Sequence, residues 1–285
     1  MNISVYITSY NQKEFLKEAI QSVLNQTLPP FEIIVVDDAS TDGSQELIKE
    51  YAIKHNIRYV FHEQNMGVTQ ARLTALQNVK GDYVTYVDGD DVYLENKLEV
   101  ESNIIKKQKC DIAFSNNAYV LEQNLDAVQW VWMEQNQELD VATNVFLKTL
   151  TRDFPRSSLF RMELVNYQKL KEIGFHDPKL NIYEDYDLRI RLARHCSFGY
   201  STAVTSKVRI SKAGLSKSHA KLHLSSLKYI FNKYSDEIER LSDPVKKEVN
   251  FKLAQILELY TPATVKNHEN SFFSKVKRGI KKIFS

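Results

Sequence analysis

The first third of the chain alternates short apolar runs with segments of helical periodicity. Unbroken apolar or β-branched runs occupy residues 3–9, 32–38, 57–63 and 82–87. Between these runs, apolar residues recur at three- and four-residue spacing, which predicts helices, the first of them from Lys13 to Asn25. Strands that show no polar alternation are typical of a parallel sheet covered by helices on both faces. The pattern therefore predicts an α/β fold with a doubly wound, mostly parallel central sheet.

The periodicity weakens beyond Cys110 but still predicts ordered elements. Residues 110–116 form one more apolar run and predict a strand, whereas residues 121–137 are too polar to assign. The remaining predictions, in order, are a helix ending at Gly174, a helix over 184–195, a basic glycine-containing loop over 206–223, and helices over 222–235 and 244–260. The chain therefore ends in a helical extension of the α/β region.

The amino-acid composition limits which classes of protein the chain can belong to. With 43% hydrophobic and 26% charged residues, the 285-residue chain can form a packed core. A net charge of +2 gives no reason to expect nucleic acid as a partner. The sequence contains no run of about 18 apolar residues and no basic-then-apolar leader pattern, and Cys110 and Cys196 match no metal or redox spacing. We expect a cytoplasmic protein.

Carboxylates gather where two predicted strands end. Asp37 and Asp38 close the second run, and Asp88, Asp90 and Asp91 follow the fourth. Ligands bind beyond the carboxyl ends of the strands in such sheets, and like charges so close together repel one another. The acids could be caps and turn residues, or the magnesium pocket of a phospho-acceptor receiver domain. In a third interpretation, Asp88 and Asp90 hold a divalent cation that bridges a substrate diphosphate.

Five segments stand out along the chain: "ITSYN", "IIVVDDASTDGS", "NMGVTQARLTAL", "YVDGDD" and "FRMELVNYQKLKEIGFHDPKLNIYEDYDLRIRLA". Together and in this order they resemble glycosyltransferase family 2, whose members have the GT-A fold. The resemblance covers about residues 1–216 and implies an inverting enzyme of the bacterial surface-glycan type. It divides a GT-A domain at residues 1–220 into a nucleotide-sugar-binding half, 1–115, and an acceptor half, 116–220, followed by a helical region at 221–285.

The resemblance also assigns roles to residues of the donor half. The "YVDGDD" segment departs from the family's usual pattern by having Gly89 where Ser is commoner. The implied roles are base contacts for Thr8 and Tyr10, a base N–H acceptor in Asp38, a base or diphosphate contact in Arg72, a ribose or metal contact in Asp88, and metal ligation by Asp90 with Asp91 close behind. The implied cofactor is Mn²⁺ or Mg²⁺.

In the acceptor half, the resemblance makes Asp185 the general base, oriented by Glu184, and makes Arg209 a substrate-binding residue. The implied reaction moves a hexosyl or N-acetylhexosaminyl group from a nucleotide-diphosphate sugar, with a UDP-sugar favoured, to a hydroxyl of a glycan or lipid-linked acceptor. One alternative is a nucleotidyltransferase, which would normally carry a glycine-rich phosphate loop after the first strand, where "TSYNQKEF" has no glycine. The other is a non-catalytic sugar-nucleotide-binding protein, which would require a lost base or metal site.

The C-terminal segment has an amphipathic pattern. Phe272, Val276, Ile280 and Phe284 recur every four residues, and six of the seven charged residues from Lys266 onward are basic. A basic amphipathic helix is typical of a membrane-surface element. We therefore expect peripheral contact with the inner face of the cell membrane, with packing on its own domain or on a protein partner as the alternatives.

Overall fold

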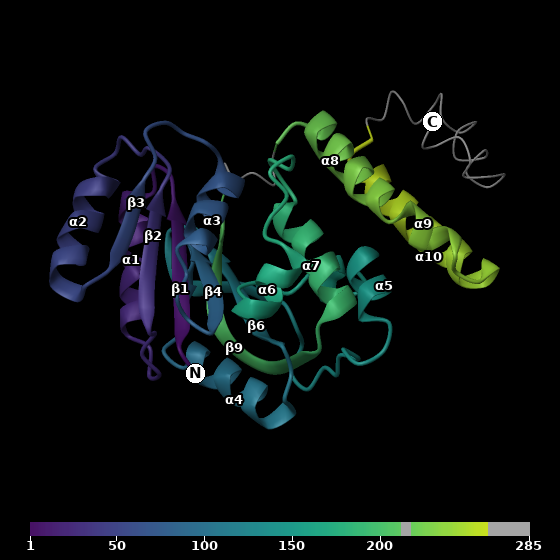
Figure 1. The fold of residues 1–285 in the computed structure, drawn as a ribbon, viewed down its shortest axis with the longest axis horizontal. Helices are drawn as coiled ribbons and strands as arrows, with labels where there is room; N and C mark the ends of the chain where they lie inside the picture. Colours follow the sequence, from purple (N-terminus) through teal and green to yellow (C-terminus); the bar gives the residue numbers. More distant parts are fainter. Residues whose placement is uncertain (212–217, 262–285) are drawn as a thin grey trace. The chain divides into compact units, whose positions relative to one another are not determined.

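The computed structural model describes residues 1–211 and 218–261 and shows a mixed α/β fold (Figure 1). The chain divides into two compact units, Met1–Lys212 and Ala213–Ser285. The first unit begins with β1 (Ile3–Ser9), α1 (Lys13–Leu24), β2 (Glu32–Asp37), α2 (Ser44–His55), β3 (Arg58–Phe61), α3 (Val68–Gln77) and β4 (Tyr83–Asp88). It continues with β5 (Val92–Tyr93), α4 (Lys97–Gln108), β6 (Ile112–Leu121), β7 (Asn124–Val131), α5 (Val145–Leu150), the 3-10 helix η1 (Pro155–Ser157), β8 (Leu164–Asn166), α6 (Tyr167–Ile173), α7 (Glu184–His195) and β9 (Phe198–Ile210).

The strands of the first unit form one sheet in the order β3-β2-β1-β4-β8-β6-β9-β5, with β7 paired to β6. The first four strands are parallel to one another, as the sequence predicted. Beyond β4 the sheet is mixed, because β8 runs antiparallel to both β4 and β6, while β6 and β9 are parallel. The α/β fold is confirmed, and β1 to β4 form its parallel part.

The register of the parallel strands decides where the functional side chains gather. Thr8 in β1 lies opposite Val36 in β2 and Asp88 in β4, and Ser9 lies opposite Asp37. The carboxyl ends of β1, β2 and β4 therefore meet at one edge of the sheet. The two acidic segments that follow β2 and β4 flank the end of β1.

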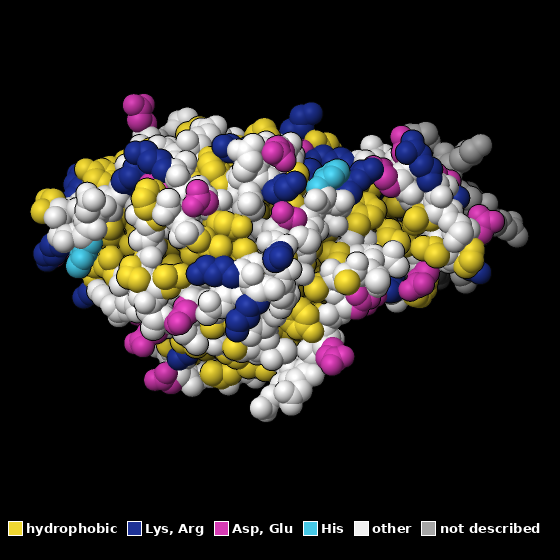
Figure 2. Space-filling model, turned by 60° about the horizontal axis from the view of Figure 1, so that its bottom comes forward, with side chains coloured by type: hydrophobic (Ala, Val, Ile, Leu, Met, Phe, Trp, Pro, Cys, Tyr) yellow, Lys and Arg dark blue, Asp and Glu magenta, His cyan; other side chains and the backbone are white. Residues whose placement is uncertain are grey.

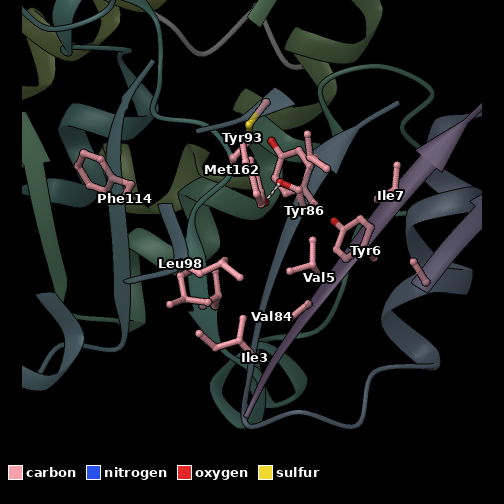
Figure 3. Close-up of a cluster of buried hydrophobic side chains, with 14 of the residues drawn as sticks. Ile3, Val5, Tyr6, Ile7, Val84, Tyr86, Tyr93, Leu98, Phe114 and Met162 are labelled. Carbon is pink, nitrogen blue, oxygen red and sulfur yellow. Dashed lines mark hydrogen bonds between the residues drawn. The ribbon is translucent and has the colours of Figure 1, made fainter. Parts of the chain in front are cut away.

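The core lies on both faces of these strands. All seven residues of β1 are buried, so helices and loops cover the sheet on both sides. Tyr6 stacks on Tyr86 with ring centroids 5.6 Å apart, and the Tyr93 hydroxyl donates to the Tyr86 carbonyl (Figure 3). Complete burial of a side chain such as Ile7 stabilises the fold by about 1.5–3 kcal/mol. This packing fixes β4, and with it the acidic turn at the end of the strand.

Past Cys110 one prediction needs correction, and one unassigned segment gains a structure. The basic loop predicted over 206–223 was wrong for residues 206–210, which form the end of β9. Ser206 and Lys207 pair with Tyr93 and Val92 of β5, so the backbone hydrogen bonds come from a partner more than a hundred residues away. The polar segment 121–137, which the sequence left unassigned, contains β7, and that strand pairs only with β6 among the described strands.

The described part of the second unit is helical, as predicted. It contains α8 (Ala220–Lys233), α9 (Ser235–Glu239) and α10 (Asp243–Glu258), with Leu227, Ile230 and Leu253 among their buried residues. The predicted amphipathic segment around Phe272 to Phe284 lies outside the described residues. No helix within residues 1–211 or 218–261 combines the length and apolar character needed to cross a bilayer. On the face drawn in Figure 2, basic and acidic side chains are interspersed over the coloured surface.

Candidate active site

The acidic turn after β4 packs tightly on the end of β1. The Gly89 amide donates to the Thr8 carbonyl at 3.0 Å. A Cβ at Gly89 would lie 2.9 Å from both the Thr8 carbonyl oxygen and Gln12 Oε1, which is too close for a side chain. Glycine therefore lets the turn approach β1 closely and holds Asp88 and Asp90 at the edge of the sheet.

Asp88 is neutralised by two arginines. Its Oδ1 accepts from Arg72 Nη2 at 2.7 Å, and its Oδ2 accepts from Arg161 Nη2 at 2.9 Å. Burial raises the pKa of Asp88, but the charges of Arg72 and Arg161 outweigh burial and hold that pKa below its ordinary value. Asp88 is therefore a carboxylate at neutral pH.

The other two acids of the turn differ from Asp88 and from each other. Asp91 is 2% exposed, and its Oδ1 accepts the Arg209 backbone N–H at 2.8 Å. Asp90 has no ion-pair partner among the described residues. Burial and then the charge of Asp88 raise the pKa of Asp90, and burial raises the pKa of Asp91 well above its ordinary value. Asp90 is the acid whose charge the fold leaves uncompensated.

Arg209 anchors this turn. Its guanidinium donates to the Asp90 carbonyl, to Glu18 Oε2 at 2.6 Å and to the Glu122 carbonyl at 3.0 Å, and it lies over the Phe15 ring. The side chain is therefore surrounded by protein. The arrangement gives Arg209 a role in positioning Asp90, whereas its direct contact with substrate stays a prediction.

Arg72 links the acidic turn to the start of α7. Its Nη1 lies 3.2 Å from Glu184 Oε1, while its Nη2 holds Asp88, and the guanidinium stacks over the Tyr86 ring at 4.7 Å. Burial raises the pKa of Glu184 to about 7, against the opposing charge of Arg72. The structure therefore brings together Arg72, Asp88 and Glu184, which the sequence had placed in two different motifs.

Asp185 lies beside Glu184 in the first turn of α7. Its Oδ2 accepts from Arg189 Nη1 at 2.5 Å, and its side chain is 33% exposed. Arg189 is itself fixed by Glu163, to which its Nε donates at 2.9 Å. Although burial raises it, the charges of Arg189 and Arg72 hold the pKa of Asp185 well below its usual range. Asp185 is thus an oriented carboxylate that remains accessible.

Asp38 is held in a different way. It accepts from the backbone amides of Met66 and Gly67, at 2.8 and 2.7 Å, and lies 2.7 Å from His62 Nδ1. The neighbouring Thr8 is buried, whereas Tyr10 is 47% exposed. Three of the lone-pair sites of Asp38 are thus occupied, and its contact with a base N–H stays a prediction.

Several residues of the site were missed from the sequence. Arg161 reaches Asp88 across 73 positions, and no local pattern could have predicted that contact. Arg189 could have been found, because it lies one helical turn after Asp185, at the (i, i+4) spacing of an intrahelical ion pair. His62 directly follows β3 at the same edge of the sheet, where polar residues deserve inspection.

The oxygen ligands that the site offers show whether it fits a divalent cation. Across residues 1–211 and 218–261, no group of three or more His, Cys, Asp or Glu side chains is arranged to hold a metal by itself. Magnesium is commonly held by one or two carboxylates together with substrate phosphate oxygens. The unpaired Asp90 fits that smaller ligand set. Both oxygens of Asp88 accept from arginines, so Asp88 would have to share one of them with the metal, and Asp91 Oδ1 is engaged by the Arg209 backbone.

The fold and the site together define an α/β protein of GT-A type, with an acidic turn at the carboxyl edge of its parallel strands. The model of glycosyl transferase family 2 matches residues 4–165. The chain belongs to glycosyl transferase family 2.

Curated relatives support the same assignment. The chain is 28% identical over 174 residues to TuaG of Bacillus subtilis, a glycosyltransferase whose name provisionally assigns it to teichuronic acid biosynthesis. That match covers 60% of this chain and 69% of TuaG. The chain spans 64% or less of the length of several further curated relatives, which are named as glycosyltransferases of Rickettsia typhi and Streptococcus pneumoniae.

Solved structures show the same fold at low sequence identity. The chain is similar to S. aureus TarS 1-349 in complex with UDP-GlcNAc, with a TM-score of 0.68, 22% identity and coverage of 90% of this chain and 72% of that one. It is also similar to the mannosyltransferase PcManGT from Pyrobaculum calidifontis in complex with GDP-Man and Mn²⁺, with a TM-score of 0.60 and 14% identity. That match covers 95% of this chain and 75% of PcManGT.

Proposed function

We propose that the protein is a metal-dependent inverting glycosyltransferase that moves a hexosyl or N-acetylhexosaminyl group from a nucleotide-diphosphate sugar to a hydroxyl. A UDP-sugar is the favoured donor. The observation that carries the proposal is one charge network with two available acids, Asp90 and Asp185, at its ends. Arg72 connects the turn of Asp90 to α7 by holding both Asp88 and Glu184.

In the donor subsite, Asp90 and Asp88 would hold Mn²⁺ or Mg²⁺, and Asp91 would support the turn. A bound divalent cation supplies Lewis-acid stabilisation of the negative charge on a leaving diphosphate. Tyr10, Thr8 and Asp38 lie at the ends of the neighbouring strands and would receive the base. The complexes of similar folds with UDP-GlcNAc and with GDP-Man and Mn²⁺ support this class of donor.

In the acceptor subsite, Asp185 would act as the general base. As the acceptor oxygen forms its bond to the anomeric carbon, the bond from that carbon to the diphosphate breaks and the hydroxyl proton passes to Asp185. Arg189 orients Asp185 by donating to its Oδ2, and Glu184, the preceding residue of α7, would assist it. Attack from the face opposite the leaving group inverts the anomeric centre and needs no glycosyl-enzyme intermediate.

The proposed acceptor is a glycan or a lipid-linked glycan of bacterial cell-surface polysaccharide synthesis. The likeness to TuaG, whose name refers to teichuronic acid biosynthesis, supports this class of acceptor. The proposed location is the cytoplasmic face of the membrane. The basic amphipathic pattern around Phe272 to Phe284 supports peripheral attachment there.

The proposal is tested by incubating the protein and Mn²⁺ with a panel of UDP- and GDP-sugars and a lipid-linked glycan extract. We expect nucleoside diphosphate release that depends on both donor and acceptor, an inverted linkage by NMR, and loss of transfer in Asp185→Asn. Glu14→Gln on the exposed side of α1 is the matched control and should be fully active. Nucleotide binding without any transfer or donor hydrolysis would favour a non-catalytic binding protein.

A further inference from the structure

Arg161 differs from the other arginines of the site in its exposure. The side chains of Arg72, Arg189 and Arg209 are 6%, 3% and 2% exposed, whereas that of Arg161 is 31% exposed. Arg161 is therefore the cation of this network that a ligand can reach most readily.

The donors of Arg161 are only partly used. Its Nη2 donates to Asp88 at 2.9 Å and lies 3.7 Å from Asp91. Its Nε is buried and has no hydrogen-bond partner, and the described residues provide none for Nη1. Because the protein encloses Nε, Nη1 is the donor of this guanidinium that has capacity for an incoming acceptor.

The position of Arg161 suggests which acceptor it would take. Asp88 and Asp91, its two partners, lie on either side of Asp90 in the same turn. Asp88, Asp90 and Asp91 crowd this turn, so an anion that binds beside it needs a positively charged partner within reach. A guanidinium N–H donates strong, charge-assisted hydrogen bonds to phosphate oxygens.

We propose that Arg161 is a donor-binding residue that contacts the diphosphate of the sugar nucleotide through Nη1 while Nη2 stays on Asp88. This assignment rests on the proposed function. In it, Arg161 stabilises the negative charge that develops on the diphosphate when the sugar is transferred. It also explains why a residue of the acceptor half reaches into the donor subsite.

The test is isothermal titration of the full-length protein with UDP and GDP, and with uridine and guanosine, all in Mn²⁺. For the diphosphate that the wild type prefers, we expect Arg161→Gln to raise Kd about tenfold or more, as the loss of a charge-assisted contact implies. The matching nucleoside, which lacks phosphate, should bind Arg161→Gln as it binds the wild type. Arg156→Gln is the matched control, because Arg156 is exposed in the same segment and pairs with Glu134.

Arg161→Lys keeps the charge but removes the planar guanidinium that can hold Asp88 and a phosphate oxygen at once, and we expect it to raise Kd for the diphosphate by a smaller factor, about threefold. It also preserves the test should Arg161→Gln fail to fold. Equal diphosphate affinity in the wild type and the Arg161 variants would overturn the assignment while leaving the proposed function standing. A parallel loss of nucleoside binding would show a structural role and overturn it too. If the wild type binds neither diphosphate, the proposed function and this assignment fail together.

Discussion

Two acidic turns follow the strands that flank β1, and they are held by different kinds of partner. After β2, Asp37 accepts from Ser40 and Gln45, and Asp38 accepts from the amides of Met66 and Gly67. These donors are mostly uncharged groups that shape the loop. After β4, the charged side chains of Arg72 and Arg161 hold Asp88, and Asp90 has no ion-pair partner within residues 1–211 and 218–261.

The kind of partner thus distinguishes acids that build a loop from acids that are available to a ligand. In the first turn each carboxylate satisfies buried N–H groups, so its removal costs stability. In the second turn the carboxylates crowd together, and burial with neighbouring charge raises the pKa of Asp90. The fold tolerates that unfavourable charge at Asp90, which is typical of functional sites.

The largest effect should follow from Asp90→Asn. The substitution removes the one uncompensated carboxylate of the second turn while keeping its shape. Because a bound metal ion contributes several kcal/mol to charge stabilisation, we expect transfer to fall by about 1,000-fold or more. Initial rates of UDP release at saturating donor measure the effect. A loss smaller than tenfold would show that Asp90 does not hold the metal and that the turn after β4 is not the metal site.

Asp185→Asn should have the next largest effect, by removing the proton acceptor at the other end of the network. General-base catalysis typically contributes about 10² to 10⁴-fold, so we expect kcat to drop within that range while the Kd for the nucleotide stays unchanged. Single-turnover kinetics and nucleotide titration separate the two quantities. A raised Kd with an unchanged kcat would show that Asp185 binds the donor and is not the base.

In the first turn the main effect should be on stability. Asp38→Ala leaves the Met66 and Gly67 amides without their acceptor, and we expect the free energy of unfolding to fall by about 2–4 kcal/mol. Urea denaturation of Asp38→Ala and Asp90→Ala, side by side, compares the two turns. If Asp90→Ala loses as much stability as Asp38→Ala, the distinction between the turns is wrong.

The smallest effect concerns stability and pH in Asp90→Asn. The pKa of Asp90 is raised in the folded protein, so the folded state binds a proton more tightly than the unfolded chain does. Asp90 therefore weakens the fold as pH rises through this range, and at neutral pH Asp90→Asn should melt slightly higher than the wild type. The difference should shrink as pH falls toward about 4, the ordinary carboxylate range. Melting curves at several pH values check the sign, and a wild type that melts higher at neutral pH would contradict it.

Features that depend on residues close together along the chain could be predicted from the sequence, and features that depend on distant residues could not. The strands of the parallel half carry a local, unbroken apolar pattern, and β1, β2 and β4 were predicted correctly. The end of β9 was mistaken for a loop because its pairing with β5 is long-range, although the alternation of Lys207, Val208 and Arg209 carried a two-residue period.

The residues of the site also fall into those that the sequence could predict and those that it could not. The acids of both turns stood out because they cluster along the chain. Their partners did not, since Arg161 approaches Asp88 only when β8 pairs with β4 and β6. The sequence could therefore predict the acids of the second turn as candidates, whereas only the structure could distinguish the unpaired Asp90 from the paired Asp88 and Asp91.

The central claim is that the turn after β4 is a metal and diphosphate site, and the most direct test is thermal unfolding of wild type and Asp90→Asn with UDP, with and without Mn²⁺. A ligand at 100 times its Kd stabilises by about 2.7 kcal/mol, which raises the melting point by several degrees. We expect UDP with Mn²⁺ to raise the wild-type melting point and Asp90→Asn to lose the Mn²⁺-dependent part of that rise. A rise of equal size in Asp90→Asn would contradict the central claim.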